Sequence, residues 1–451
     1  MANAAGFQDS VKKVLNARIA SKKVVVPDPY EEEVHLQEVK NARRRSFQKL
    51  VKKVVHTQTT IRTVDHRAHA KHVLYPSRCR VTITKVPVVG GDPITPDTAI
   101  ELRERVFGAA DLLTFSLNEW LGQSFCFHDA GTALAYGLKA PKSSTKGLVM
   151  CVQAYVLKHL LFNSHKPGAV GDVIRLLRTT KKAQVDALVG ALSDILWKAG
   201  ERKHAVLCLT RDEVHVSDDP CYMEDGCTEK IVIFNYGKYE ELKFNIRKYL
   251  YEMVNEDGNG ILLFLYSLVL SRTFHRLSED RCGEDQSLIL GNGMIQPCLA
   301  TLVITGRATL YLHNGIIYEG TEETMAKPKT GILIRAEIGL LVWRRPEGNS
   351  QEVVGSRLKT PSFPIWVTRC NDSYGILFYT SRDLLRDYHA ENRFDLYYYS
   401  SSTSQIAATI LSIDTRVRPR RDDQQIPPLE NLIHTKWQDA DVSWNGTTPY
   451  V

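Results

Sequence analysis

The hydrophobic pattern of this 451-residue chain changes its period about two-thirds of the way along. In the first part, apolar residues recur every three or four positions, which indicates helices. Those helices are predicted over residues 96–107, 148–162, 182–198, 243–254 and 261–274, with short strands at 205–209 and 231–234. In the last third, runs of β-branched and aromatic residues between turn residues predict an antiparallel sheet. Its strands are expected at residues 363–368, 375–379, 394–399 and 407–413. Helices followed by strands predict an α+β fold rather than a doubly wound α/β fold.

A stretch rich in proline and glycine precedes the first of these helices. Residues 86–96 contain three prolines and two glycines, which is typical of a linker. Thr95, Pro96 and Asp97 then form a helix start signal of cap, first-turn proline and first-turn acid. We therefore expect a domain boundary here, with an N-terminal extension over residues 1–92 and one large domain over residues 93–451.

Positive charge is concentrated ahead of this boundary. The whole chain carries +7, but the segment from Lys40 to Lys85 alone holds thirteen lysines and arginines against one acid, a net +12. We expect this basic arm to be a solvated, partly disordered extension. Its charge would also suit contact with an acidic protein surface or nucleic acid, or nuclear import.

Cysteine usage and hydropathy indicate the compartment. The nine cysteines are an odd number, so we expect a reducing environment. None of them forms a C-x-x-C pair, so we expect no structural metal, and we expect no cofactor. No signal peptide is evident, and the most apolar run, residues 261–270, is too short to cross a bilayer. The predicted location is the cytoplasm or the nucleus, without membrane contact.

The order of an early helix start and a late antiparallel sheet is that of papain-like cysteine hydrolases, with a helical lobe beside the sheet. In that layout the nucleophilic thiol lies at a helix N-terminus, where the helix dipole lowers its pKa and free N–H groups bind the oxyanion. The base histidine lies on a strand of the sheet. Residues 142–162 and 363–378 are therefore where catalytic groups would be expected.

Several segments resemble the MINDY family of lysine-48-linkage deubiquitinases, in the family's order, from about residue 95 to the end of the chain. The matching segments are residues 120–125, 152–162, 291–293, 302–308, 358–367, 394–399, 434–437 and 444–446. The resemblance implies a deubiquitinase fold, with ubiquitin or lysine-48-linked polyubiquitin as partner. Residues 1–90 resemble no family that we can name.

The chain departs from the family's pattern at the three positions that carry the chemistry. Active relatives have the nucleophilic cysteine where this chain has Lys146, and a glutamine that holds the oxyanion where it has Ala140. Their base histidine corresponds to Ser373. A lysine cannot perform thiol acyl transfer, and a serine is no general base near neutral pH. The resemblance is thus to the catalytically inactive branch, and we expect a pseudo-deubiquitinase.

Two alternatives stay open. An active or residual cysteine hydrolase would need Cys126, Cys151 or Cys370 to move into place. Cys151 is expected to be a buried thiol, and Cys126 with His128 lacks an activating helix terminus. His159, Asp395 and Asp414 are expected to be structural. The other alternative is an adaptor that acts through the basic arm without binding ubiquitin.

Overall fold

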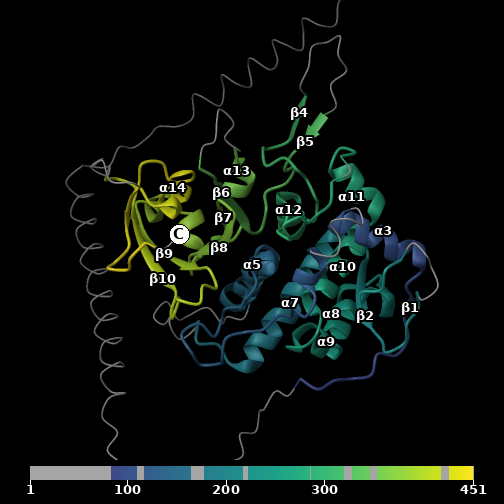
Figure 1. Ribbon diagram of the computed structural model, residues 1–451. Coiled ribbons are helices and arrows are strands. Elements are labelled where there is room, and N and C mark those ends of the chain that lie inside the picture. Colours follow the sequence, from purple (N-terminus) through teal and green to yellow (C-terminus); the bar gives the residue numbers. More distant parts are fainter. Residues whose placement is uncertain are drawn as a thin grey trace, which may run out of the picture. The chain divides into compact units, whose positions relative to one another are not determined.

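The computed structural model describes residues 83–108, 116–163, 177–216, 222–284, 286–318, 328–345, 353–417 and 426–449. The predicted basic arm therefore lies outside the described residues, apart from its last three positions. Helices and strands are both abundant in the described part, so the predicted mixture of helix and sheet is confirmed (Figure 1). None of the described helices is long and apolar enough to cross a membrane.

The helical half is built around the two long helices α5 and α7. They are Ser143–Lys158 and Lys181–Ala199, and they pack directly against each other. The other helices of this half are α3 (Pro96–Phe107), α8 (Tyr239–Lys248), α9 (Leu250–Val254), α10 (Gly260–Arg272), α11 (Phe274–Asp280) and α12 (Pro297–Thr305). Helix α10 is buried along nearly its whole length, which accounts for its predominantly apolar sequence.

Local signals set several of these helix ends. Thr95 caps α3 by accepting a hydrogen bond from the backbone of Thr98, and Pro96 is the first helical residue, as predicted. Thr180 caps α7 in the same way, and Gly200 ends it. Helix α5 differs, because it starts five residues earlier than predicted and continues into a π-helical turn, His159–Asn163.

A three-stranded antiparallel sheet flanks the helices. Its order is β1 (Asp92–Pro93), β3 (Ile231–Tyr236) and β2 (Ala205–Thr210), and α10 packs against β2. The strand β1 lies inside the segment that reads as a linker, and Val86 and Val88 also pack against the core. The described residues just before position 92 therefore already pack against the same core as the helices. The domain boundary predicted between residues 92 and 93 stays a prediction.

The second half is a six-stranded sheet with the order β11-β10-β9-β8-β7-β6. The strands are β6 (Gly339–Trp343), β7 (Ile365–Cys370), β8 (Ser373–Phe378), β9 (Arg393–Tyr399), β10 (Thr409–Asp414) and β11 (Asp441–Ser443). The antiparallel meander from β7 to β10 is confirmed. The sequence reading missed β11 and β6, and β6 runs parallel to β7.

Helix α5 lies between this sheet and the rest of the helical half (Figure 1). Ile376 and Phe378 of β8 join the core that contains α5, whereas Leu377 joins a second core with α14 (Pro428–His434). A short helix, α13 (Ser356–Lys359), packs against β6. The hairpin of β4 (Ile316–Tyr318) and β5 (Pro328–Thr330) projects from the other elements. The sheet and the helices thus meet along α5.

Candidate functional site

The segment that leads into α5 is held by side chains from two other parts of the fold. The buried Gln153 donates from Nε2 to the carbonyl oxygen of Tyr136 at 2.8 Å and accepts at Oε1 from the backbone N–H of Leu138 at 2.7 Å. The hydroxyl of Tyr399, at the end of β9, donates to the carbonyl oxygen of Leu138 at 2.7 Å. Buried backbone groups need such partners, so these bonds fix the path of the chain into α5.

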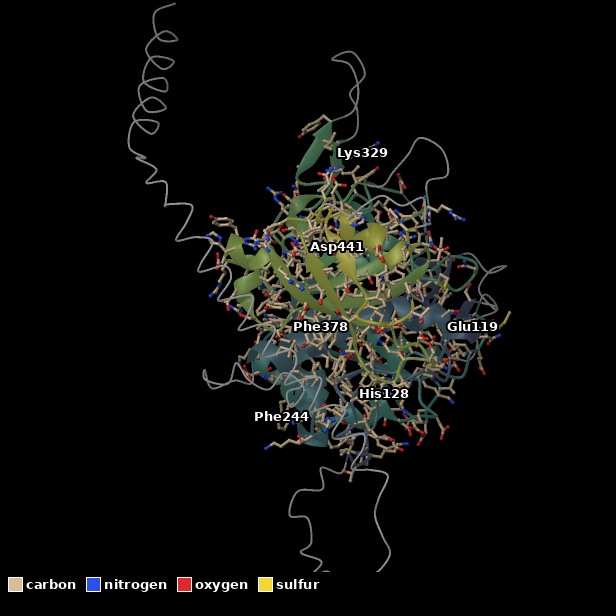
Figure 2. The ribbon with its side chains drawn as sticks, turned by 90° about the vertical axis from the view of Figure 1, so that its left-hand side faces the viewer. Glu119, His128, Phe244, Lys329, Phe378 and Asp441 are labelled. Atoms are coloured by element: carbon tan, nitrogen blue, oxygen red, sulfur yellow. The ribbon has the colours of Figure 1, made fainter. Side chains whose placement is uncertain are left out.

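Two further contacts extend this frame. His128 places its Nε2 3.1 Å from the Tyr399 hydroxyl, and the backbone N–H of Ala140 donates to the Oγ of Ser401 at 2.8 Å. Residue 139 donates to the carbonyl oxygen of Cys126 at 2.7 Å. Figure 2 shows His128 and Phe378, from the two halves of the fold that meet here. Residues 126–128 and 399–401 therefore clamp residues 136–140 from both halves.

Lys146 is the fourth residue of α5, so the prediction that it lies at a helix N-terminus is confirmed. Ala140 lies three residues before the helix and is buried at 9% exposure. Ser373 is the first residue of β8, directly after a two-residue turn. The strand does face the helix start, because a Cβ added to Gly147 would lie 3.1 Å from Cε2 of Tyr374.

It is Tyr374, rather than Ser373, whose side chain packs on α5. Side chains alternate between the two faces of a strand, and Tyr374 shares its face with Ile376 and Phe378 in the α5 core. A Cβ at Gly375 would meet the ring of Tyr398 in the other core. The alternation therefore places the Ser373 side chain away from α5, which corrects the expectation that Ser373 faces Lys146.

Two of the matching sequence segments meet at the same helix start. The indole Nε1 of Trp120 donates to the carbonyl oxygen of Gly293 at 2.9 Å. Ser144, the second residue of α5, donates to a carboxylate oxygen of Glu119 at 3.4 Å. Segments far apart in the sequence thus converge on the first turn of α5.

The first turn of α5 is electrostatically positive. It contains no acidic residue, and its N-cap, Lys142, makes no capping hydrogen bond with its side chain. Lys146 is half-buried, and its burial lowers the pKa of the ammonium. Its ammonium makes no hydrogen bond or ion pair with any described residue. A cation at this position adds to the positive end of the helix dipole.

The three cysteines considered as substitute nucleophiles are poorly placed for that role. Cys151 is fully buried in the middle of α5, and burial raises the pKa of its thiol to about 12. Burial also raises the pKa of Cys370 to about 12. Cys126 is partly exposed, but burial and then the carboxylate of Glu256 raise its pKa as well. Thiolate is the reactive form, so all three are weak nucleophiles at neutral pH.

The sequence reading missed one cysteine at a helix start. Cys298 is the second residue of α12, and the preceding Gln296-Pro297 pair was an available start signal. A Cβ on Gly147 would lie 2.4 Å from Cδ1 of Ile295, so this helix begins close to α5. Cys298 is nevertheless buried, and burial raises the pKa of its thiol to about 11.

The remaining candidates have structural partners. His159 lies at the far end of α5, where its Nε2 is 3.0 Å from Asp194. Asp395, within β9, accepts a hydrogen bond from Ser412 at 2.6 Å. Asp414 ends β10 and accepts from the backbone N–H at position 416. These contacts agree with the structural roles expected for all three residues.

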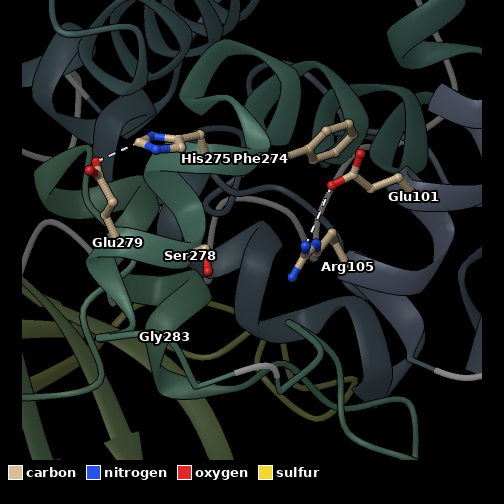
Figure 3. A pocket seen from close by; sticks show the side chains of 7 residues that line it. All are labelled: Glu101, Arg105, Phe274, His275, Ser278, Glu279 and Gly283. Atoms are coloured by element: carbon tan, nitrogen blue, oxygen red, sulfur yellow. Dashed lines mark hydrogen bonds and ion pairs between the residues drawn. The ribbon is translucent and has the colours of Figure 1, made fainter.

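A groove of about 560 Å³ lies elsewhere, between α3 and α11 (Figure 3). Two ion pairs line it: Arg105 lies 3.5 Å from Glu101, and His275 lies 3.7 Å from Glu279. It contains none of the predicted site residues. Among the described residues, no group of three or more histidine, cysteine or acidic side chains could hold a metal ion.

Comparison with known proteins gives a consistent result. The family model for the conserved domain of the deubiquitinating enzymes MINDY-3/4 matches residues 103–446. The chain is 33% identical over 364 residues to the probable ubiquitin carboxyl-terminal hydrolase MINDY-4 of Xenopus tropicalis, which covers 80% of the chain and 47% of the relative. It is 32% identical to the Homo sapiens protein of the same name over 380 residues, 82% of the chain and 49% of the relative.

A more distant relative is the ubiquitin carboxyl-terminal hydrolase MINDY-3 of Homo sapiens. It is 26% identical over 282 residues, which cover 57% of the chain and 59% of the relative. The chain spans about half the length of the MINDY-4 proteins that it matches. No solved structure matches it.

Proposed function

Because this chain belongs to the MINDY-3/4 family of deubiquitinating enzymes, we propose that it is a pseudo-deubiquitinase, which binds ubiquitin but does not cleave it. The observation that carries the proposal is the first turn of α5. A half-buried lysine without a partner among the described residues lies there, at the position where the family resemblance places the nucleophilic thiol.

Three features support the loss of chemistry. Lys146 provides no thiol, and a lysine cannot perform thiol acyl transfer. Ala140 has no side-chain donor for an oxyanion. Ser373 is no general base, and the alternation of β8 directs its side chain away from α5.

The hydrogen-bonded frame of Gln153 and Tyr399 supports a binding role for the start of α5. The bonds of Gln153 and Tyr399 to residues 136–138 hold the approach to α5 in one conformation, although they serve no catalytic group in this proposal. A site that has lost its chemistry but keeps a rigid frame is suited to binding. We propose ubiquitin as the ligand, and lysine-48-linked polyubiquitin as its preferred form.

The test is to incubate the full-length protein with lysine-48-linked tetra-ubiquitin and to measure binding and cleavage in the same samples. We expect binding without cleavage. Cleavage that a single Cys126→Ala change abolishes would overturn the proposal in favour of a residual cysteine hydrolase. Neither binding nor cleavage would favour an adaptor that acts through the basic arm between Lys40 and Lys85.

A second experiment asks whether the lost groups account for the missing activity. Ala140→Gln and Lys146→Cys are combined in one protein with Tyr374→His, because Tyr374 rather than Ser373 is the β8 residue that packs on α5. A matched control replaces Lys146→Cys with Lys142→Cys, which puts the new thiol at the helix cap instead. Cleavage by the first combination alone would support the assignment of these positions, and equal cleavage by both would contradict it.

A further inference from the structure

Lys146 is an uncompensated charge within the described part of the chain. Its side chain is half-buried, its pKa is lowered by burial alone, and no described acid or carbonyl oxygen contacts its ammonium. By contrast, the buried Lys158 and the half-buried Lys198 both contact the carboxylate of Glu337. Partial burial of a charge without a counter-charge costs free energy that an anionic ligand would recover.

The surroundings of Lys146 leave few groups that could neutralise it. The neighbouring Gly147 packs against the buried side chains of Ile295 and Tyr374. The carboxylate of Glu119 accepts a hydrogen bond from Ser144, two positions before Lys146, and makes no ion pair with Lys146. The start of α5 therefore offers one cation without a counter-charge among the described residues, which suits a single carboxylate at the end of a chain.

We propose that Lys146 binds the free C-terminal carboxylate of ubiquitin, and that it makes this protein selective for unconjugated ubiquitin ends. This inference rests on the proposed function. Its relatives are named as hydrolases that act at the carboxyl terminus of ubiquitin, so that terminus is the part of the ligand that would approach α5.

The selectivity follows from charge. A free C-terminus carries a full negative charge, whereas the carbonyl of an isopeptide bond is neutral. The ammonium of Lys146 attracts the charged carboxylate by a Coulombic interaction between two full charges, which the neutral carbonyl cannot provide. Lys146 thus favours free ubiquitin and unanchored chains over ubiquitin that is attached to a substrate.

The test uses the full-length protein and two forms of mono-ubiquitin, one with its natural C-terminal carboxylate and one with a C-terminal amide. Calorimetry measures Kd for both. We expect the carboxylate form to bind roughly tenfold more tightly, in line with one charge-assisted contact. Lys146→Met should abolish the difference, and Lys146→Arg should keep it. Lys203→Met, which removes an exposed lysine in the turn after α7, is the matched control and should leave the difference unchanged.

The outcomes separate this inference from the proposal on which it rests. Equal affinity for the two forms of ubiquitin would overturn the role of Lys146 and leave ubiquitin binding intact. Binding of neither form would overturn both. The comparison within the unmodified protein decides the question even if a variant fails to fold.

Discussion

Two lysines on α5, twelve positions apart, have opposite surroundings. Lys158, near the end of the helix, is buried with its Nζ 2.9 Å from Asp194 and 3.2 Å from Glu337. Lys146, in the first turn, is half-buried and has no described partner. Where a charge serves the fold, the chain supplies carboxylates around it. The absence of a carboxylate partner for Lys146 among the described residues is the contrast on which the proposed ligand role rests.

The paired end of the helix is a small ionic network. Burial by itself raises the pKa of Asp194, but the hydrogen bond from His159 and the charge of Lys158 outweigh it and hold that pKa well below its usual range. Tyr239 donates to the same carboxylate at 2.6 Å. The network joins α5, α7, α8 and the residue Glu337 ahead of β6, so it connects the helices to the sheet.

The largest expected effect is from Lys158→Met. The change leaves Asp194 and Glu337 partly buried without their shared cation, and breaking such a pair from one side typically costs about 3 kcal/mol. Urea denaturation at pH 7 would measure the loss of unfolding free energy. A loss below about 1 kcal/mol would mean that the paired end contributes as little as an exposed ion pair, which would remove the contrast with Lys146.

A smaller effect is expected from Tyr399→Phe, which tests the neutral frame at the other end of α5. The variant loses the hydroxyl that donates to the carbonyl oxygen of Leu138, and a buried hydrogen bond contributes about 1 kcal/mol. Thermal unfolding would give the change in stability. Ubiquitin affinity should fall with it, because the lead-in to α5 loses a constraint. Unchanged stability and affinity would show that Gln153 holds this segment alone.

The smallest effect is expected from Lys146→Met, which should leave stability at pH 7 unchanged or raise it by less than about 1 kcal/mol. The pKa of Lys146 is lowered from 10.5, so the folded state disfavours its charged form. That penalty applies below the folded pKa and disappears as the pH rises through it towards 10.5. Urea denaturation at pH 7 and pH 10 should therefore show the two proteins converging. A variant that is clearly less stable at pH 7 would imply a structural partner for Lys146.

Local patterns were sufficient to predict much of the fold. The start of α3 follows from Thr95 and Pro96, because a cap needs only its own neighbouring residues. The strands β7 to β10 follow from alternation and turn residues, since consecutive antiparallel strands pair through short connections. The strand β6 was missed because its parallel partner follows only after a long connection, which leaves no local signal.

The candidate site was predicted in its position and corrected in its detail. Lys146 lies in the first turn of a helix, as expected, and β8 faces it. The orientation of Ser373 was wrong, because a strand's face depends on which neighbouring layer it packs against. The frame of Gln153 and Tyr399 was not foreseen, since these two residues are 246 positions apart and meet only on the backbone of Leu138.

The identities of the candidate groups follow from the amino-acid sequence alone: a lysine, an alanine and a serine at positions 146, 140 and 373. The order of helices followed by a sheet follows from it as well. These are properties of single residues and of short-range periodicity. Only the tertiary structure decided that Lys158 has carboxylate partners while Lys146 has none among the described residues, and that Tyr374 is the β8 residue on α5. The pairing of charges and the facing of side chains depend on contacts between distant segments, which form only when the sheet packs against the helices.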